Sequence, residues 1–142
     1  MILLFLDANV LFTAAHNPDG KAALVVDLAG NEGPWALVTS DLAAEEARRN
    51  LGRRYPTHLG RFEEMLLGIP RVSPPLPHEC PVPLVEKDRP ILHAAIAAQA
   101  THLLTGDIKH FGPHMNSPEQ TAGVTIQTVG SFLDAWLRNS LS

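Results

Sequence analysis

The sequence predicts an α/β fold in which helices cover both faces of a central parallel sheet of about four or five strands. Short apolar runs alternate with helical segments along the chain, which is the pattern of a parallel sheet with crossover helices. Hydrophobic residues make up 45% of the 142 residues and charged residues only 18%, a balance that favours a buried core. The length suits one core, so we expect a single domain over residues 1–142.

The composition excludes several classes of protein. Cys80 is the only cysteine, so the chain is not a disulfide-built secreted scaffold and has no Cys-x-x-Cys metal site. The apolar run at 1–6 is too short for a signal peptide, and no stretch approaches the roughly 20 apolar residues of a membrane span. We therefore expect a soluble, cytoplasmic protein that has no membrane partner. The net charge of −4 does not by itself favour nucleic-acid binding, although five of the eleven basic residues fall in one segment: Arg48, Arg49, Arg53, Arg54 and Arg61.

The first half of the chain predicts two strands separated and followed by helices. In order we expect a strand at 2–6, a short helix or turn at 10–15, a helix at 21–31, a strand at 35–39, and helices at 42–51 and 56–67. The strands are continuous apolar runs, which are typical of strands buried on both faces. Gly33 and Pro34 end the helix at 21–31, and Ser40 and Asp41 are good caps for the helix after the second strand.

The second half begins with an irregular crossing and returns to alternating elements. Six prolines at 69–83 exclude a regular helix and a central strand there. Asp88-Arg89-Pro90 opens the clearest helix, at 91–100, because proline is tolerated in the first turn. We then expect a strand at 102–105, a loop at 110–122, a strand at 124–129, and a C-terminal helix capped by Ser131 and running to 137.

Acidic residues follow the predicted strands at their carboxyl ends. Asp7 ends the first strand, Asp107 follows the third, and Asp88 opens a helix whose start we place near the same edge. Glu45 and Glu46 lie in the first turns of the helix after the second strand. Function collects at this edge of a parallel sheet, so the pattern brings four acids to one rim. Each acid also has an alternative structural role. Asp88 could be a simple N-cap, Asp107 a turn residue, and the two glutamates solvated side chains.

Such a cluster of carboxylates requires a counterion. The acids repel one another unless they are protonated or paired with cations, and no matching set of basic residues is evident at the strand ends. Hard oxygen ligands suit Mg²⁺ or Mn²⁺, and a metal held in this way can activate water for attack at phosphorus. The acids therefore favour a metal-dependent nuclease.

The choice between the two glutamates rests on the helix that carries them. The spacing from Ser40 and the apolar neighbour at 47 favour Glu46 over Glu45. Glu46 shares a face with Arg49 at i+3, and with Arg53 at i+7 if the helix continues through Gly52. An acid with arginines beside it suits a phosphate backbone, so we expect Arg49 and Arg53 to bind substrate.

Four segments taken together resemble the PIN-domain ribonucleases. They are Leu6-Asp7-Ala8-Asn9-Val10-Leu11, Glu46, Asp88-Arg89-Pro90-Ile91-Leu92-His93-Ala94-Ala95, and Leu104-Thr105-Gly106-Asp107. The resemblance runs from residue 2 to about 129. It implies a three-layer α/β/α fold and hydrolysis of RNA by Asp7, Glu46, Asp88 and Asp107, with one or two Mg²⁺ or Mn²⁺ ions. It implies that Asp7, Asp88 and Asp107 are the metal ligands. Asn9 and Thr105 match polar positions that support the first and last acids, and we expect both to bind substrate.

The resemblance also implies partners. Many PIN-domain proteins are toxins of toxin–antitoxin pairs. The resemblance therefore implies RNA as the substrate and an antitoxin as a possible protein partner. Other members act in RNA processing, and some have lost activity. Where relatives often carry a further acid shortly after the last aspartate, this chain has Lys109 and His110, which weakens the case for a second metal ion.

Several alternatives to this interpretation remain open. A phosphatase of the haloacid dehalogenase type also starts with a strand and an aspartate, but it needs a second acid where this chain has Asn9. A non-catalytic PIN-like module that binds RNA or protein is the other alternative, and the presence of all four acids argues against it.

Two further groups of side chains have more than one interpretation. A structural zinc site would use His110 and His114 with the nearby His93 and His102, although Gly112 and Pro113 disfavour helical geometry. A C-terminal apolar stripe either packs on the sheet or forms a homodimer contact, and core packing is the better interpretation. The stripe consists of Phe132, Leu133, Trp136 and Leu137.

Overall fold

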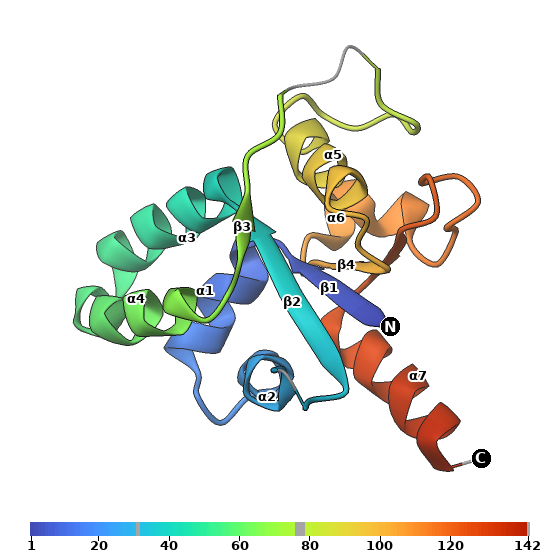
Figure 1. Ribbon diagram of the computed structural model, residues 1–142. Helices are drawn as coiled ribbons and strands as arrows, with labels where there is room; N and C mark the ends of the chain where they lie inside the picture. The colour runs from blue at the N-terminus through green and yellow to red at the C-terminus, as the bar shows by residue number, and fades with distance from the viewer. Residues whose placement is uncertain (31, 76–78, 142) are drawn as a thin grey trace.

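Five parallel strands form one sheet in the order β3-β2-β1-β4-β5, which confirms the predicted α/β class (Figure 1). The computed structural model describes residues 1–30, 32–75 and 79–141. The strands are β1 (Ile2–Leu6), β2 (Trp35–Ser40), β3 (Arg71–Val72), β4 (His102–Leu104) and β5 (Thr125–Gln127). The predicted helix end at Asn31 and the proline at 77 lie outside the described residues.

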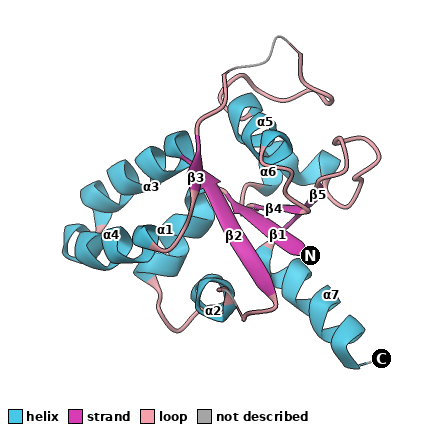
Figure 2. Ribbon diagram, in the orientation of Figure 1, coloured by secondary structure: helices cyan, strands magenta, loops and turns pink. Residues whose placement is uncertain are grey.

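Helices lie on both sides of this sheet, so the architecture has three layers. They are α1 (Ala8–His16), α2 (Lys21–Leu28), α3 (Asp41–Arg54), α4 (Leu59–Leu67), α5 (Arg89–Ala97), α6 (Ile108–Phe111) and α7 (Val129–Leu141), with short 3₁₀ turns at Pro56–His58 and Gly112–His114. Figure 2 shows α1, α3 and α4 together on one side of the strands and α5 with α6 on the other. No helix within the described ranges has both the length and the apolar character to cross a membrane.

The central strand β1 explains why the first apolar run is continuous. It pairs with β2 on one edge and β4 on the other, so Phe5 stands beside both Val38 and Leu103. Leu4, Phe5 and Leu6 have no exposed surface. A strand that is covered by helices on both faces has no place for alternating polar residues.

The order of the strands reverses beside β1. The chain moves from β1 outward through β2 to β3, then returns to place β4 on the opposite edge of β1. In open parallel sheets, ligands bind outside the carboxyl ends of strands at such a reversal. Here these ends lie beside each other, since the backbone N–H of Asp7 donates to the carbonyl of Leu104 at 3.1 Å.

The strand β3 corrects the prediction of an irregular segment at 69–83. Arg71 and Val72 pair with Thr39 and Ser40 at the edge of the sheet, and the carbonyl of Pro70 accepts from the N–H of Thr39 at 3.0 Å. An edge strand of two residues tolerates flanking prolines because one of its sides needs no donors. The pairing partner is more than thirty positions away, so no local pattern predicts the strand.

The C-terminal helix α7 begins three residues earlier than a cap at Ser131 predicts. Ser131 does not cap it; the hydroxyl of Thr128 accepts from the N–H of Ser131 at 3.1 Å. Part of the apolar stripe packs into the core, as favoured from the sequence. Phe132 and Leu133 are buried, and the rings of Phe132 and Trp136 lie 5.1 and 5.0 Å from the ring of Trp35.

Candidate active site at the carboxyl edge of the sheet

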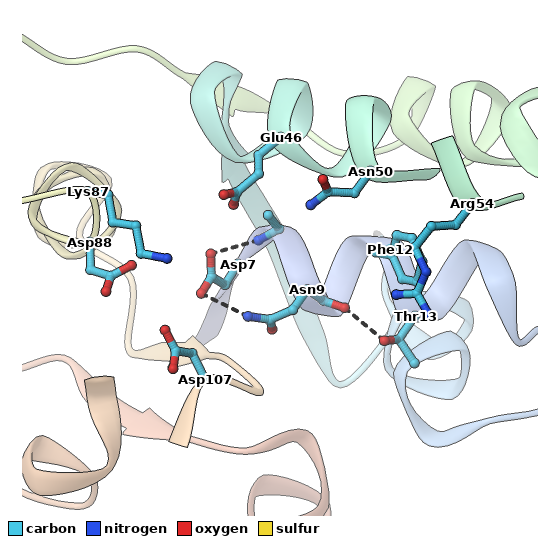
Figure 3. A pocket seen from close by; sticks show the side chains of 11 residues that line it. Asp7, Asn9, Phe12, Thr13, Glu46, Asn50, Arg54, Lys87, Asp88 and Asp107 are labelled. Carbon is cyan, nitrogen blue, oxygen red and sulfur yellow. Dashed lines mark hydrogen bonds between the residues drawn. The ribbon is translucent and has the colours of Figure 1, made fainter. Parts of the chain in front are cut away.

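A cavity of about 600 Å³ opens where β1 and β4 end. Its lining consists of Asp7, Ala8, Asn9, Phe12, Thr13, Glu46, Asn50, Arg54, Lys87, Asp88 and Asp107. All four acids singled out from the sequence are among these residues, and they come from four separate parts of the chain (Figure 3).

Asp7 is the most buried of the four acids, with 5% of its surface exposed. It is the N-cap of α1, and its Oδ1 accepts from the N–H of Ala8 at 2.7 Å. Its Oδ2 accepts from the hydroxyl of Thr105 at 2.7 Å. Burial raises the pKa of Asp7 to about 6, against the two hydrogen bonds that lower it, and the charges of Glu46 and Asp88 raise it further.

Thr105 and Asn9 connect the first acid to the last. The Thr105 hydroxyl donates to Asp7 and accepts from the backbone N–H of Asp107 at 3.1 Å. Asn9 donates to Asp7 Oδ2 at 3.3 Å, and its Oδ1 accepts from the N–H of Gly106 at 2.7 Å. Thr105 is fully buried, whereas Asn9 also lines the cavity. These bonds fix the loop after β4 against the start of α1.

Asp88 occupies the N-cap position of α5, but its carboxylate makes no capping hydrogen bond. Its Oδ2 is buried and has no hydrogen-bond partner among the described residues. Nδ1 of His110 lies 3.0 Å from this oxygen, which is an ion-pair distance when the imidazole is protonated. Burial and the nearby charge of Asp107 raise the pKa of Asp88, while His110 and Lys87 oppose the rise. The interpretation of Asp88 as a simple cap therefore does not account for its side chain.

Asp107 and His110 form one unit at the start of α6. Oδ1 of Asp107 accepts from the backbone N–H of His110 at 3.1 Å, and Oδ2 lies 2.9 Å from Nδ1 of the imidazole. His110 therefore faces two carboxylates at once. Within the described part of the chain, Asp88, Asp107 and His110 form a group whose potential ligand atoms all lie within 4.8 Å of one another.

The group is not the set expected from the sequence, because His110 belongs to it and Asp7 does not. The sequence placed His110 only in a possible zinc site with other histidines, because the aspartates that it faces come from different loops. Of the four histidines considered for zinc, the other three are outside this group; His114 instead places Nε2 3.0 Å from the carbonyl of Pro83.

The two adjacent glutamates point in different directions. Glu46 lines the cavity beside Asp7, and Glu45 pairs with Arg48 at 2.8 Å. Arg48 also pairs with Glu63 of α4 at 2.8 Å, so Glu45 belongs to an ion-pair network on the outer surface. Successive helix positions differ by about 100°, which separates the two carboxylates.

The basic side chains around the cavity differ from the expected ones. Arg49 and Arg53 are exposed and do not line the cavity, although α3 does continue through Gly52. Asn50 and Arg54, four and eight positions after Glu46, line it instead, because α1 packs against that side of α3. The structure also places basic residues at the strand ends that were not expected there, since Lys87 and Arg54 line the cavity and His110 faces two aspartates.

The donor set fits a divalent cation. Carboxylate oxygens suit Mg²⁺ and Mn²⁺, and an imidazole nitrogen is a ligand that first-row transition ions accept well. The buried Oδ2 of Asp88 would gain a partner from such an ion. A hydrophobic or neutral ligand would leave the repulsion between Asp88 and Asp107 in place.

Comparison with known proteins agrees with this description. Residues 4–109 match a family model described as the PIN domain. No curated protein sequence gives a significant match.

Solved structures share the fold, and two of them illustrate it. One is the crystal structure of VapBC2 from Rickettsia felis bound to a DNA fragment from its promoter, with a TM-score of 0.62 and 12% identity, covering 89% of this chain and 98% of the other. The second is VapBC-1 from nontypeable Haemophilus influenzae, with a TM-score of 0.58 and 18% identity, covering 91% of this chain and 99% of the other. At these identities the matches establish the architecture alone.

Proposed function

The chain belongs to the PIN-domain family, and from this premise we propose that it is a metal-dependent endoribonuclease that hydrolyses phosphodiester bonds of RNA. The observation that carries the proposal is the convergence of four acids on one cavity, in which the buried Oδ2 of Asp88 has the imidazole of His110 as its neighbour at 3.0 Å. Burying a carboxylate beside other acids destabilises the fold unless a cation neutralises the cluster, so a bound cation is the best reason for this arrangement. Membership in this family excludes the haloacid dehalogenase interpretation.

Asp7, Asp88 and Asp107 would hold the Mg²⁺ or Mn²⁺ ion. When bound, the ion supplies Lewis-acid activation of water and neutralises charge on the phosphate. Glu46 faces the same cavity and has no hydrogen bond or ion pair with the described residues, so we assign its carboxylate as the acceptor of a proton from the attacking water. Asn9 and Thr105 keep Asp7 oriented through the hydrogen bonds to its Oδ2.

Substrate binding uses the basic residues that surround the cavity. Arg48 is paired with two glutamates, and Arg61 donates to the carbonyl of Ala15 at 3.0 Å, so these two are occupied. Arg49 and Arg53 are exposed on α3, and we propose that they contact phosphates of the RNA outside the cavity. Such contacts strengthen binding and make it dependent on salt, without selecting a sequence.

A role as the toxin of a toxin–antitoxin pair is the biological setting that we propose. The two structural matches named above are VapBC complexes, which supports an antitoxin as the protein partner. A small upstream reading frame that encodes a protein with a DNA-binding N-terminus would favour this assignment over a role in RNA processing.

Cleavage of single-stranded RNA by the purified protein tests the proposed activity. With Mn²⁺ or Mg²⁺, we expect internal cleavage of a 5′-labelled RNA, and with excess EDTA we expect none, because the carboxylates then lack the cation that neutralises them. Asp88→Asn should remove cleavage at equal protein concentration, and Asp134→Asn, on the exposed surface of α7, should not. RNA binding without cleavage under every metal condition would favour the non-catalytic module instead.

We further propose that His110 is itself a ligand of the ion, because its Nδ1 lies 2.9 and 3.0 Å from oxygens of the two aspartates. Pulsed electron paramagnetic resonance of the Mn²⁺-loaded protein should then detect coupling to a directly bound ¹⁴N nucleus. The coupling should vanish in His110→Gln and persist in His93→Gln. Tight Mn²⁺ binding without nitrogen coupling would show that the imidazole only hydrogen-bonds to the carboxylates.

A further inference from the structure

The end of the cavity away from Asp88 differs chemically from the acidic end. It is lined by Phe12, Thr13, Asn50 and Arg54 (Figure 3). The guanidinium carbon of Arg54 lies 5.3 Å from the ring centroid of Phe12 and 5.5 Å from that of Tyr55. We call Phe12, Arg54 and Tyr55 the stacking shelf.

The two rings of the stacking shelf lie close together, and a further ring packs against them. The rings of Phe12 and Tyr55 lie 6.0 Å apart, and His16 stacks on Tyr55 with centroids 3.9 Å apart and an interplanar angle of 16°. These contacts join α1 to the end of α3. Arg54 is exposed and forms no ion pair with a carboxylate of the described residues, unlike Arg48. Its planar group is therefore positioned over the rings and still available to a ligand.

From this arrangement we propose that the stacking shelf is a nucleobase subsite, where one unpaired base next to the scissile phosphate stacks on Arg54 and Phe12. The inference rests on the proposed ribonuclease function. Proteins that recognise single-stranded RNA stack bases on aromatic rings and on arginine planes. A cavity of about 600 Å³ has room for a nucleotide as well as its phosphate.

Asn50 and Thr13 border the same space and can meet the edge of the base. Asn50 is exposed and its amide offers both donors and an acceptor, which a stacked base would need at its polar edge. The hydroxyl of Thr13 already donates to the carbonyl of Asn9 at 2.8 Å, which leaves its lone pairs to accept. Bases inside a duplex cannot reach such a shelf, so the subsite selects single-stranded RNA.

A double-mutant cycle tests the subsite: one change removes a base from the RNA, and the other alters the stacking shelf of the protein. The substrates are short single-stranded RNAs of one sequence in which an abasic nucleotide replaces each position near the cut in turn. For the wild-type protein with Mn²⁺, we expect one abasic position to lower kcat/KM roughly tenfold, because stacking is worth about 1–3 kcal/mol per base. Arg54→Lys, which keeps the charge, and Phe12→Leu should each lower kcat/KM on intact RNA by a similar factor.

The decisive result is whether the losses multiply. If the base stacks on the shelf, the abasic position should have little further effect in Arg54→Lys or Phe12→Leu, and a full effect in Arg138→Lys on α7. If the loss of kcat/KM from the abasic nucleotide and the loss from the substitution multiply while RNA is still cleaved, only the proposed subsite is overturned. Arg54 would then contact a phosphate or only stabilise the fold. Absence of both RNA binding and cleavage would overturn the proposed function as well.

A binding measurement provides a readout that does not depend on activity. RNA carrying 2-aminopurine at the sensitive position should lose fluorescence when it binds in EDTA, since stacking quenches this base. Arg54→Lys and Phe12→Leu should restore most of the fluorescence at saturating protein. Equal quenching in the wild type and both variants would contradict the proposal.

Discussion

Asp7→Asn is expected to stabilise the metal-free protein at neutral pH while it removes RNA cleavage. Asp7 is almost fully buried and its pKa is raised from 3.8 to about 6, so ionising it in the folded state is unfavourable. A rise of about two units corresponds to about 3 kcal/mol. Asparagine keeps an oxygen that can accept from the N–H of Ala8 and carries no charge to bury.

The pH dependence identifies the source of this gain. Below about pH 4, Asp7 is protonated in both the folded and the unfolded chain, and its burial carries no charge penalty. Between about pH 4 and 6 the unfolded chain releases the proton first, so the wild-type protein loses stability as the pH rises through the folded pKa. The difference in unfolding free energy between Asp7→Asn and wild type should therefore grow by about 3 kcal/mol across this interval.

Urea unfolding in EDTA at a series of pH values measures this difference. Hydrogen bonds lost in the variant, such as the one from Asn9, shift the difference by the same amount at every pH. The change with pH is thus the diagnostic quantity. Asp134→Asn, on the exposed surface of α7, is the matched control and should show no such growth. A flat difference for Asp7→Asn would mean that its carboxyl is better solvated than its burial indicates.

Glu46→Gln should lower the single-turnover rate of RNA cleavage by about 10²–10⁴-fold, the range for removal of a positioned general base. Affinity for RNA should be retained or improved, because a negative charge leaves the cavity. Glu45→Gln is the matched control: the residue is adjacent and has the same chemistry, but its carboxylate pairs with Arg48 outside the cavity. Loss of that exposed ion pair should change stability by no more than about 1 kcal/mol.

The comparison of the two glutamine variants at saturating RNA decides the assignment. Equal rates for Glu46→Gln and wild type would remove Glu46 from the chemistry. A loss confined to Glu45→Gln would show that α3 presents a different face to the substrate than the one in Figure 3.

The sequence by itself predicted the features that depend on neighbouring residues. Continuous apolar runs identified β1 and β2, and the side chain of Ser40 does cap α3 by accepting from the N–H of Ala43 at 3.0 Å. Asp7 was singled out because it directly follows the apolar run of the first strand. Alternation of strands and helices then implied a parallel sheet, and the shared edge of such a sheet brought the four acids to one place.

Only the tertiary structure decided which side chains meet across that edge. His110 faces Asp88 and Asp107 because the start of α5 and the loop after β4 come together. His110 and Asp88 are twenty-two positions apart in the sequence. Lys87 and Arg54 likewise reach the cavity from different elements.

The same holds for α3 and for the shortest strand. The helical repeat placed Arg49 and Arg53 near Glu46, yet the packing of α1 selected the side with Asn50 and Arg54. The strand β3 exists because β2 supplies its partners. Periodicity and capping are local properties that short stretches of sequence encode, whereas the direction of a side chain toward a distant partner depends on how the whole core packs.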